Sequence, residues 1–283
     1  MIPLKDNIPT SGFPIVTVLL IAVNVAVFIW TLTVSGSEVP QFEGSGFTYR
    51  DEKQVELGAI PYRLTHPGKD CALGVKRSGS NGEVDVVCQG TGAYRTESSS
   101  GDPFVKIDQP PWYATIFTSM FMHGGWLHII FNMLFLWIFG NNVEEAMGRV
   151  KYLLFYLLAG IVALYAQVAL SPDSTLPTLG ASGAIAGVLG AYALLHPRAR
   201  VLTLIFIVFF VTLVEIPAWI MLGIWFILQF VPAIGQVATP DVAGGGGVAY
   251  FAHVGGFLFG LAAVKLFTLG RAPPDEVPRI PVY

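Results

Sequence analysis

The stretch from Gly180 to Gly187 reads Gly-Ala-Ser-Gly-Ala-Ile-Ala-Gly and opens an apolar segment that runs to residue 196. A segment this apolar is typical of a helix buried in protein or in lipid. Ser182 lies at its start, and His253 lies near the start of a second apolar segment, 249–269. Because a histidine can activate a serine hydroxyl as a nucleophile, this pair predicts hydrolysis inside a lipid bilayer.

The composition predicts a protein that crosses a membrane several times. Hydrophobic residues make up 53% of the chain and charged residues only 12%, which is far from the balance of a water-soluble domain. A net charge of −3 provides no basic stripe for nucleic acid. We therefore expect a lipid bilayer as the surroundings and no nucleic acid among the partners.

Turn residues divide the chain into apolar intervals, and a membrane span needs about 20 residues. The interval 201–236 is ambiguous, because about 36 residues would rise about 54 Å as a helix, against a hydrocarbon core of about 30 Å. It holds either one span with an interfacial lead-in or two tight spans. The expected spans lie at 13–34, 115–141, 150–170, 180–196, 201–236 and 249–269.

The positions of Lys and Arg favour the single span, because short loops that carry these residues stay in the cytoplasm. With six spans, all basic short segments fall on one side, whereas loops 171–179 and 237–248 contain no Lys or Arg. Both termini are then cytoplasmic, and Ser182 and His253 share the outer leaflet. The basic residues of the cytoplasmic segments are Lys5, Arg149, Lys151, Arg198, Arg200, Arg271 and Arg279.

Residues 35–111 form a large polar loop, which we expect outside the cytoplasm between the first and second spans. Cys71 and Cys88 lie in it, on either side of a turn rich in Gly, Ser and Asn. In an oxidising compartment they would form a disulfide, worth roughly 3 kcal/mol for a closed loop of about 15 residues; the alternative is two unrelated thiols. The remaining divisions are 1–34 with the first span, a catalytic core at 112–270 and a cytoplasmic tail at 271–283.

Small residues suggest how the two apolar segments meet. Gly183 and Gly187 follow Ser182, and Gly256 and Gly260 follow His253, each pair at four-residue spacing. Such stripes let membrane helices pack closely. If these faces meet, His253 comes within hydrogen-bond distance of Ser182, although the stripes alone are equally explained by packing.

His128 and Asn132 are four residues apart and so share one face of the second span. Together with the backbone N–H of Ser182, they could donate hydrogen bonds to the oxyanion of a tetrahedral intermediate. An interhelical hydrogen-bond network is the alternative. We expect no metal and no cofactor, because both cysteines lie in the outer loop and no carboxylate accompanies these histidines.

These motifs resemble those of the rhomboid intramembrane serine proteases. The resemblance covers roughly residues 112–270 and the first span. It rests on His123-x4-His128-x3-Asn132, Gly180-x-Ser182-Gly183, Ala252-His253-x-x-Gly256 and Glu144-x3-Gly148, in family order and spacing. It implies an all-α membrane protein with a six-transmembrane-helix rhomboid bundle.

By this resemblance, Ser182 is the nucleophile and His253 the general base, without a third carboxylate. His128, Asn132 and the Ser182 backbone form the oxyanion hole, and His123 is a histidine at the edge of the site. The implied substrates are transmembrane proteins cut near the outer membrane face, and we expect an integral protein of a bacterial plasma membrane. A catalytically silent rhomboid-like binding module for transmembrane helices is the alternative.

The chain departs from the family at one position that concerns the base. An aromatic residue often follows the nucleophile by one helical turn and stacks on the histidine, but this chain has Ala186 there. Another residue must therefore orient His253.

Overall fold

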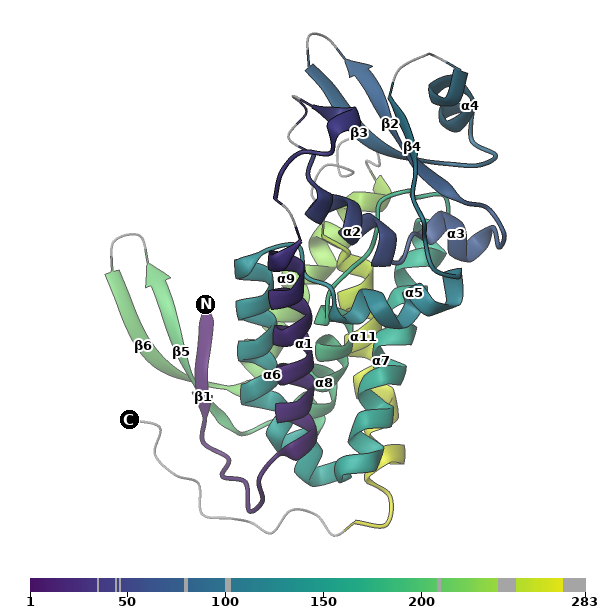
Figure 1. Ribbon diagram of the computed structural model, residues 1–283. Helices are drawn as coiled ribbons and strands as arrows, with labels where there is room; N and C mark the ends of the chain where they lie inside the picture. The colour runs from purple at the N-terminus through teal and green to yellow at the C-terminus, as the bar shows by residue number, and fades with distance from the viewer. Residues whose placement is uncertain are drawn as a thin grey trace. The chain divides into compact units, whose positions relative to one another are not determined.

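The computed structural model describes residues 1–34, 36–43, 45, 47–78, 81–99, 103–207, 210–238 and 248–271, and it is mostly helical (Figure 1). Residues 272–283 of the predicted tail lie outside the described residues. Contacts divide the chain into two compact units. The first contains residues 1–23, 126–166 and 181–283, and the second contains residues 24–125 and 167–180.

Five helices among the described residues are long and apolar enough to cross a membrane. They are α1 (Ile15–Thr33), α6 (Trp126–Met147), α7 (Arg149–Leu170), α9 (Ala218–Ala238) and α11 (Tyr250–Thr268). A sixth apolar helix, α8 (Ser182–Leu195), has 14 residues, about 21 Å of helix. The count of six spans therefore stays a prediction.

The short helix α8 is the central helix of the first unit. Its side chains from Ala184 to Tyr192 are buried on every side, and α6, α9 and α11 all pack against it. A helix enclosed in this way needs no polar face, which explains why its sequence is apolar throughout.

The first unit also contains a three-stranded antiparallel sheet beside α6, in the order β1-β5-β6 (Figure 1). Its strands are β1 (Ile2–Asp6), β5 (Arg200–Ile207) and β6 (Phe210–Pro217). The expectation of an all-α protein is therefore wrong here. The interval 201–236 holds one candidate span, α9, which agrees with the expected single span, and the residues that lead into it form a β-hairpin. A continuous apolar run does not distinguish a strand from a buried helix, and its many β-branched and aromatic residues favour the strand.

Asp6 joins this sheet to two helices. Its carboxylate accepts hydrogen bonds from Asn142 Nδ2 of α6 (2.7 Å) and from the Tyr192 hydroxyl of α8 (2.5 Å). Burial raises the pKa of Asp6 from 3.8 to about 6, because the charged form loses its hydration.

The connection between α6 and α7 holds the start of α1. The buried Glu144 carboxylate accepts from the backbone N–H of Val16 (3.0 Å) and from the N–H and hydroxyl of Thr17 (both 2.8 Å). It thereby satisfies donors that the first turn of a helix leaves unpaired. Gly148 ends α6 with φ +77°, a backbone conformation that favours glycine. The Glu144-x3-Gly148 motif therefore has a structural role at this corner.

The second unit contains most of the polar region between α1 and α6, and it has a hydrophobic core of its own. A three-stranded sheet in the order β3-β2-β4 is flanked by short helices, and Cys71 and Cys88 form a disulfide between its first two strands. The core includes Phe42, Ile60, Leu73 and Ile107. The elements are η1 (Pro40–Phe42), α2 (Tyr49–Leu57), α3 (Pro61–Thr65), β2 (Cys71–Ser78), β3 (Asn81–Cys88), α4 (Gly92–Ser99), β4 (Phe104–Lys106), α5 (Trp112–Thr118) and η2 (Ser119–Phe121).

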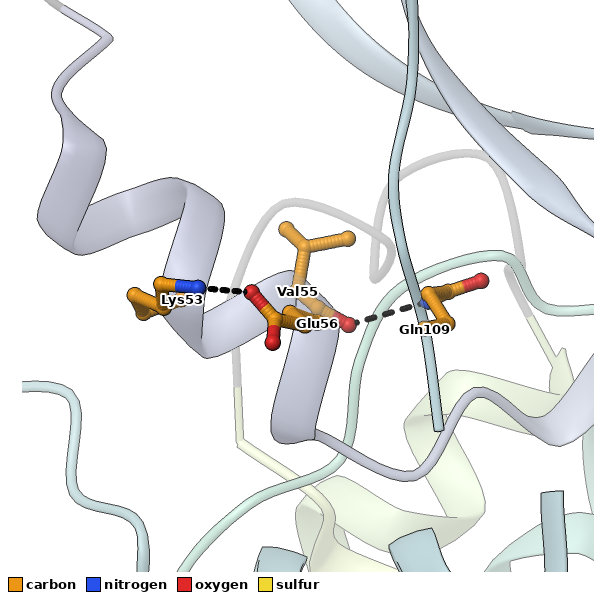
Figure 2. Close-up of polar contacts among 4 residues, drawn as sticks. All are labelled: Lys53, Val55, Glu56 and Gln109. Carbon is orange, nitrogen blue, oxygen red and sulfur yellow. Dashed lines mark hydrogen bonds and ion pairs between the residues drawn. The ribbon is translucent and has the colours of Figure 1, made fainter. Parts of the chain in front are cut away.

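Helix α2 is fixed at both ends within this unit. Thr48 and Asp51 form a capping box at its start. Figure 2 shows its last turns, where Lys53 and Glu56 form an ion pair and Gln109 Nε2 donates to the Val55 carbonyl (3.1 Å).

The 167–180 segment pairs with the chain after α2, since Ala59 and Thr178 exchange two backbone hydrogen bonds (2.9 and 2.8 Å). The polar region is therefore a folded element.

Candidate active site

Ser182 and His253 meet in the first unit. Ser182 is the first residue of α8, and His253 lies in the first turn of α11. The Ser182 hydroxyl oxygen lies 2.8 Å from Nε2 of His253, which is a hydrogen bond between the two side chains. This is the geometry that a base needs to accept a proton from a nucleophilic hydroxyl.

Glycines allow α8 and α11 to approach closely enough for this contact. A methyl group on Gly256 would lie 2.1 Å from the Gly183 carbonyl oxygen, and one on Gly260 would lie 2.0 Å from that of Gly187. Both distances are far below van der Waals contact, so the α11 positions have no room for a side chain. The predicted stripe of Gly256 and Gly260 thus lies directly against the backbone of α8.

The other two glycines of the predicted stripes serve a different contact. Methyl groups on Gly183 and Gly187 would lie 2.6 and 2.5 Å from the β-carbons of Ala163 and Ala159 on α7. A methyl group on Gly187 would also lie 3.3 Å from the Gly256 carbonyl oxygen, so Gly183 and Gly187 lie mainly against α7, and Gly187 lies against α11 as well. Helix α8 is therefore packed closely on two sides.

The backbone enters α8 through a special conformation. Gly180, two residues before Ser182, has φ +122°, which residues with a side chain rarely adopt. This explains why the Gly180-x-Ser182 motif requires glycine at its first position.

Gln229 is a site residue that the sequence reasoning missed. It lies on α9, and its amide oxygen is 2.8 Å from Nδ1 of His253. Trp225, one turn earlier on the same helix, has its ring centre 6.1 Å from that of His253. The available signal was weak, because Gln229 is one of two glutamines, with Gln236, in an otherwise apolar helix, although polar groups in such a helix often have a functional role.

His128 and Asn132 lie on α6, which packs against α8. Asn132 is 7% exposed, and its Nδ2 is buried without a hydrogen-bond partner in the described part of the chain. His128 lies one turn before Asn132 on the same helix. Their role as oxyanion donors stays a prediction.

His123 belongs to the second unit rather than to the unit that contains the dyad. Its side chain is buried, and Nδ1 lies 3.3 Å from the Phe121 carbonyl. Among the residues that the structure describes, no group of three or more His, Cys, Asp or Glu side chains is arranged to hold a metal ion.

Comparison with known proteins matches the Rhomboid domain to residues 111–269, more than half of the chain. Rhomboid protease GluP of Bacillus subtilis is 44% identical over 85 residues, which are 30% of this chain and 16% of that protein. Rhomboid protein 1, mitochondrial, of Saccharomyces cerevisiae is 29% identical over 151 residues, 52% of this chain and 40% of that protein. Inactive rhomboid protein 1 of Drosophila melanogaster is 27% identical over 89 residues, 31% of this chain and 6% of that protein.

The chain therefore spans less than half the length of each of these relatives. The matched region contains α6 to α11 and with them both Ser182 and His253. By the extent of this match, the chain belongs to the rhomboid family.

Proposed function

We propose that this protein is an intramembrane serine endopeptidase that hydrolyses peptide bonds of transmembrane proteins. The observation that carries the proposal is the 2.8 Å hydrogen bond between Ser182 and His253, at the starts of two apolar helices. Its relatives include proteins named as proteases. A water-soluble substrate would have little access to a dyad held between such helices, so the substrate is itself a membrane segment.

The reaction follows from the positions of the two side chains. His253 Nε2 takes the proton of the Ser182 hydroxyl as its oxygen attacks the substrate carbonyl. The protonated imidazole then donates that proton to the leaving amine, which departs as the acyl-enzyme forms. A water molecule, deprotonated by the same imidazole, releases the acyl group and regenerates the dyad.

The tetrahedral intermediate needs donors for its oxyanion. Asn132 fits this role because its buried Nδ2 donor has no hydrogen-bond partner among the described residues. A buried donor of this kind costs free energy unless a ligand or an intermediate satisfies it. His128 and the Ser182 backbone N–H complete the proposed hole, and the N-terminus of α8 favours negative charge at the same place.

The distribution of basic residues suggests the orientation. Lys and Arg lie in the N-terminal segment, the α6–α7 corner and the α8–β5 connection, which we assign to the cytoplasm. Ser182 and His253 then lie near the opposite face, so cleavage occurs near the extracytoplasmic end of the substrate. The substrate helix must unwind there, because helical hydrogen bonds otherwise shield its carbonyl groups.

A catalytically silent binding module is the second candidate, because the relatives include one named as an inactive rhomboid protein. The two candidates differ in what they require of Ser182. A binding module keeps its affinity for transmembrane helices without the hydroxyl, whereas a protease loses turnover.

The decisive experiment is cleavage of a reconstituted transmembrane substrate by the wild type, Ser182→Ala and His253→Ala. We expect each variant to lower kcat by at least about 10³-fold while remaining folded. Ser98→Ala and His66→Ala, which change exposed or partly exposed side chains of the second unit, are matched controls. Processing at the wild-type rate by Ser182→Ala would contradict the proposal, as would a wild type that binds such helices but cleaves none.

A further inference from the structure

We propose that Gln229 is a positioning residue that sets the tautomer of His253 and so completes a Ser182–His253–Gln229 hydrogen-bond relay. The inference rests on the proposed function, because the relay matters only if His253 acts as a base. Gln229 extends the two-residue dyad by a neutral third member on α9, a helix whose sequence contains no Asp or Glu. Gln229 would also explain how His253 is oriented, since Ala186 stands where the family often has an aromatic residue that stacks on the histidine.

The hydrogen-bond chemistry of an amide determines the direction of the relay. The oxygen of Gln229 can only accept, and it lies 2.8 Å from Nδ1 of His253. Nδ1 must therefore carry the proton, which leaves a lone pair on Nε2. That nitrogen lies 2.8 Å from the Ser182 hydroxyl, so the hydroxyl donates to it. This is the tautomer that can deprotonate Ser182, whereas the opposite tautomer would present an N–H to the serine.

A neutral amide suits this position better than a carboxylate does. A charged group in a membrane helix is costly unless it is paired, and a glutamate here would favour a permanently charged ion pair with the imidazole. The amide oxygen accepts from Nδ1–H in both protonation states of His253. It can thus hold the ring throughout the reaction without becoming charged itself.

Aromatic contacts hold α9 against the helix of the base. The ring centre of Phe257 on α11 lies 4.9 Å from that of Phe226 and 6.0 Å from that of Trp225. Trp225 and Gln229 are four residues apart, so they share one face of α9. This packing holds the Gln229 side chain at a fixed distance from His253, as a positioning role requires.

The first test reads the tautomer without any substrate. Protein with ¹⁵N-labelled histidine is compared for the wild type and Gln229→Met, and His253→Ala identifies the His253 signals. We expect a protonated Nδ1 and an unprotonated Nε2 in the wild type, and loss of that preference in Gln229→Met. The same tautomer population in both proteins, or a protonated Nε2 in the wild type, would overturn the proposal.

The second test measures turnover. Gln229→Met has nearly the same length but no acceptor, and we expect kcat to fall roughly 10- to 100-fold with little change in KM. Gln229→Glu restores an acceptor oxygen, so it should recover much of kcat and move the acidic limb of the kcat profile to higher pH. His128 on α6 and Tyr250, whose ring centre lies 6.5 Å from that of His253, are also titratable, and both are unchanged in these variants. Leu228→Met, at an exposed neighbour on α9, is the control.

These outcomes separate the two proposals. If the wild type cleaves no substrate, the proposed function fails, but the NMR comparison still decides whether Gln229 sets the tautomer. If the wild type is active and Gln229→Met keeps its kcat and pH profile, the dyad stands and the positioning role is wrong. Equal losses in Gln229→Met and Gln229→Glu would also contradict it, because only the first removes the acceptor.

Discussion

Asp6 and Tyr192 are joined by a hydrogen bond of 2.5 Å between the tyrosine hydroxyl and the carboxylate. Tyr192 lies toward the end of α8, the helix whose first residue is Ser182. The N-terminal strand therefore anchors the far end of the helix that carries the proposed nucleophile. The contact is buried, and burial raises the pKa of the Asp6 carboxyl group to about 6.

Stability should depend on pH through Asp6. Its pKa is about 6 in the folded protein against 3.8 for the ordinary group, so the folded state binds the proton more tightly than the unfolded state. The stabilisation of the folded state by this tighter proton binding is fully present below pH 3.8 and is lost as the pH rises through 6. It amounts to about 3 kcal/mol in total. Asp6→Asn should flatten the change in melting temperature between pH 4 and 6, measured in detergent. Asp173→Asn, at an exposed loop position, is the control and should leave this pH dependence of the melting temperature unchanged.

Gly260→Ala should separate α8 from α11. The added methyl group would meet the Gly187 carbonyl oxygen at 2.0 Å, so the helices must move apart, at a cost of about 1–3 kcal/mol. We expect a lower melting temperature and a loss of turnover. Gly223→Ala on α9 is the matched control, because nothing lies within 4 Å of the new methyl group, and it should be neutral or slightly stabilising. Equal effects of the two substitutions would contradict the close approach of α8 and α11.

Glu144→Gln should weaken the cap of α1. The carboxylate accepts three hydrogen bonds from Val16 and Thr17, and the amide keeps only one accepting oxygen. We expect a loss of about 0.5–2 kcal/mol in the free energy of unfolding. Thr17→Val removes the hydroxyl alone and should lose less, while Glu43→Gln at an exposed position should lose nothing. Hydrogen exchange at the first amides of α1 reports the change directly.

Reduction should destabilise the second unit. The Cys71–Cys88 bridge spans 17 residues and constrains the unfolded chain, so opening it should cost about 3 kcal/mol. The protease resistance of the described part of the second unit should fall on adding dithiothreitol. The Cys71→Ala, Cys88→Ala double variant should be as sensitive without reductant and should not respond to it. Resistance that reductant leaves unchanged in the wild type would show that the bridge contributes little.

The contact between Ser182 and His253 was predictable from short motifs. Each residue lies near the start of an apolar segment and is followed by two glycines at four-residue spacing. Gln229 could not be predicted in the same way. The two glutamines of α9, Gln229 and Gln236, have no spacing that reveals a partner, and the direction of the Gln229 side chain depends on how α9 packs on α11. The sequence did show that something must replace the aromatic residue absent at Ala186.

The β-hairpin and the second unit show where the sequence misleads. Residues 201–214 are apolar except for Thr203 and Thr212, so no period of two appears, and the sequence alone predicts only an interfacial lead-in to the span. The core of the second unit is built from residues far apart in the chain, such as Phe42, Leu73 and Ile107. Contacts of this kind leave little pattern in a local window.

The pairing of β1 with β5 also orders events during biosynthesis. Ile2 pairs with Leu204, so the first strand leaves the ribosome long before its partner exists. Residues 2–6 must wait while α1, α6, α7 and α8 are synthesised, and only then can the sheet close. Asp6 reaches Tyr192 in the same late step, so the nascent chain acquires this anchor after its serine-bearing helix has already been made.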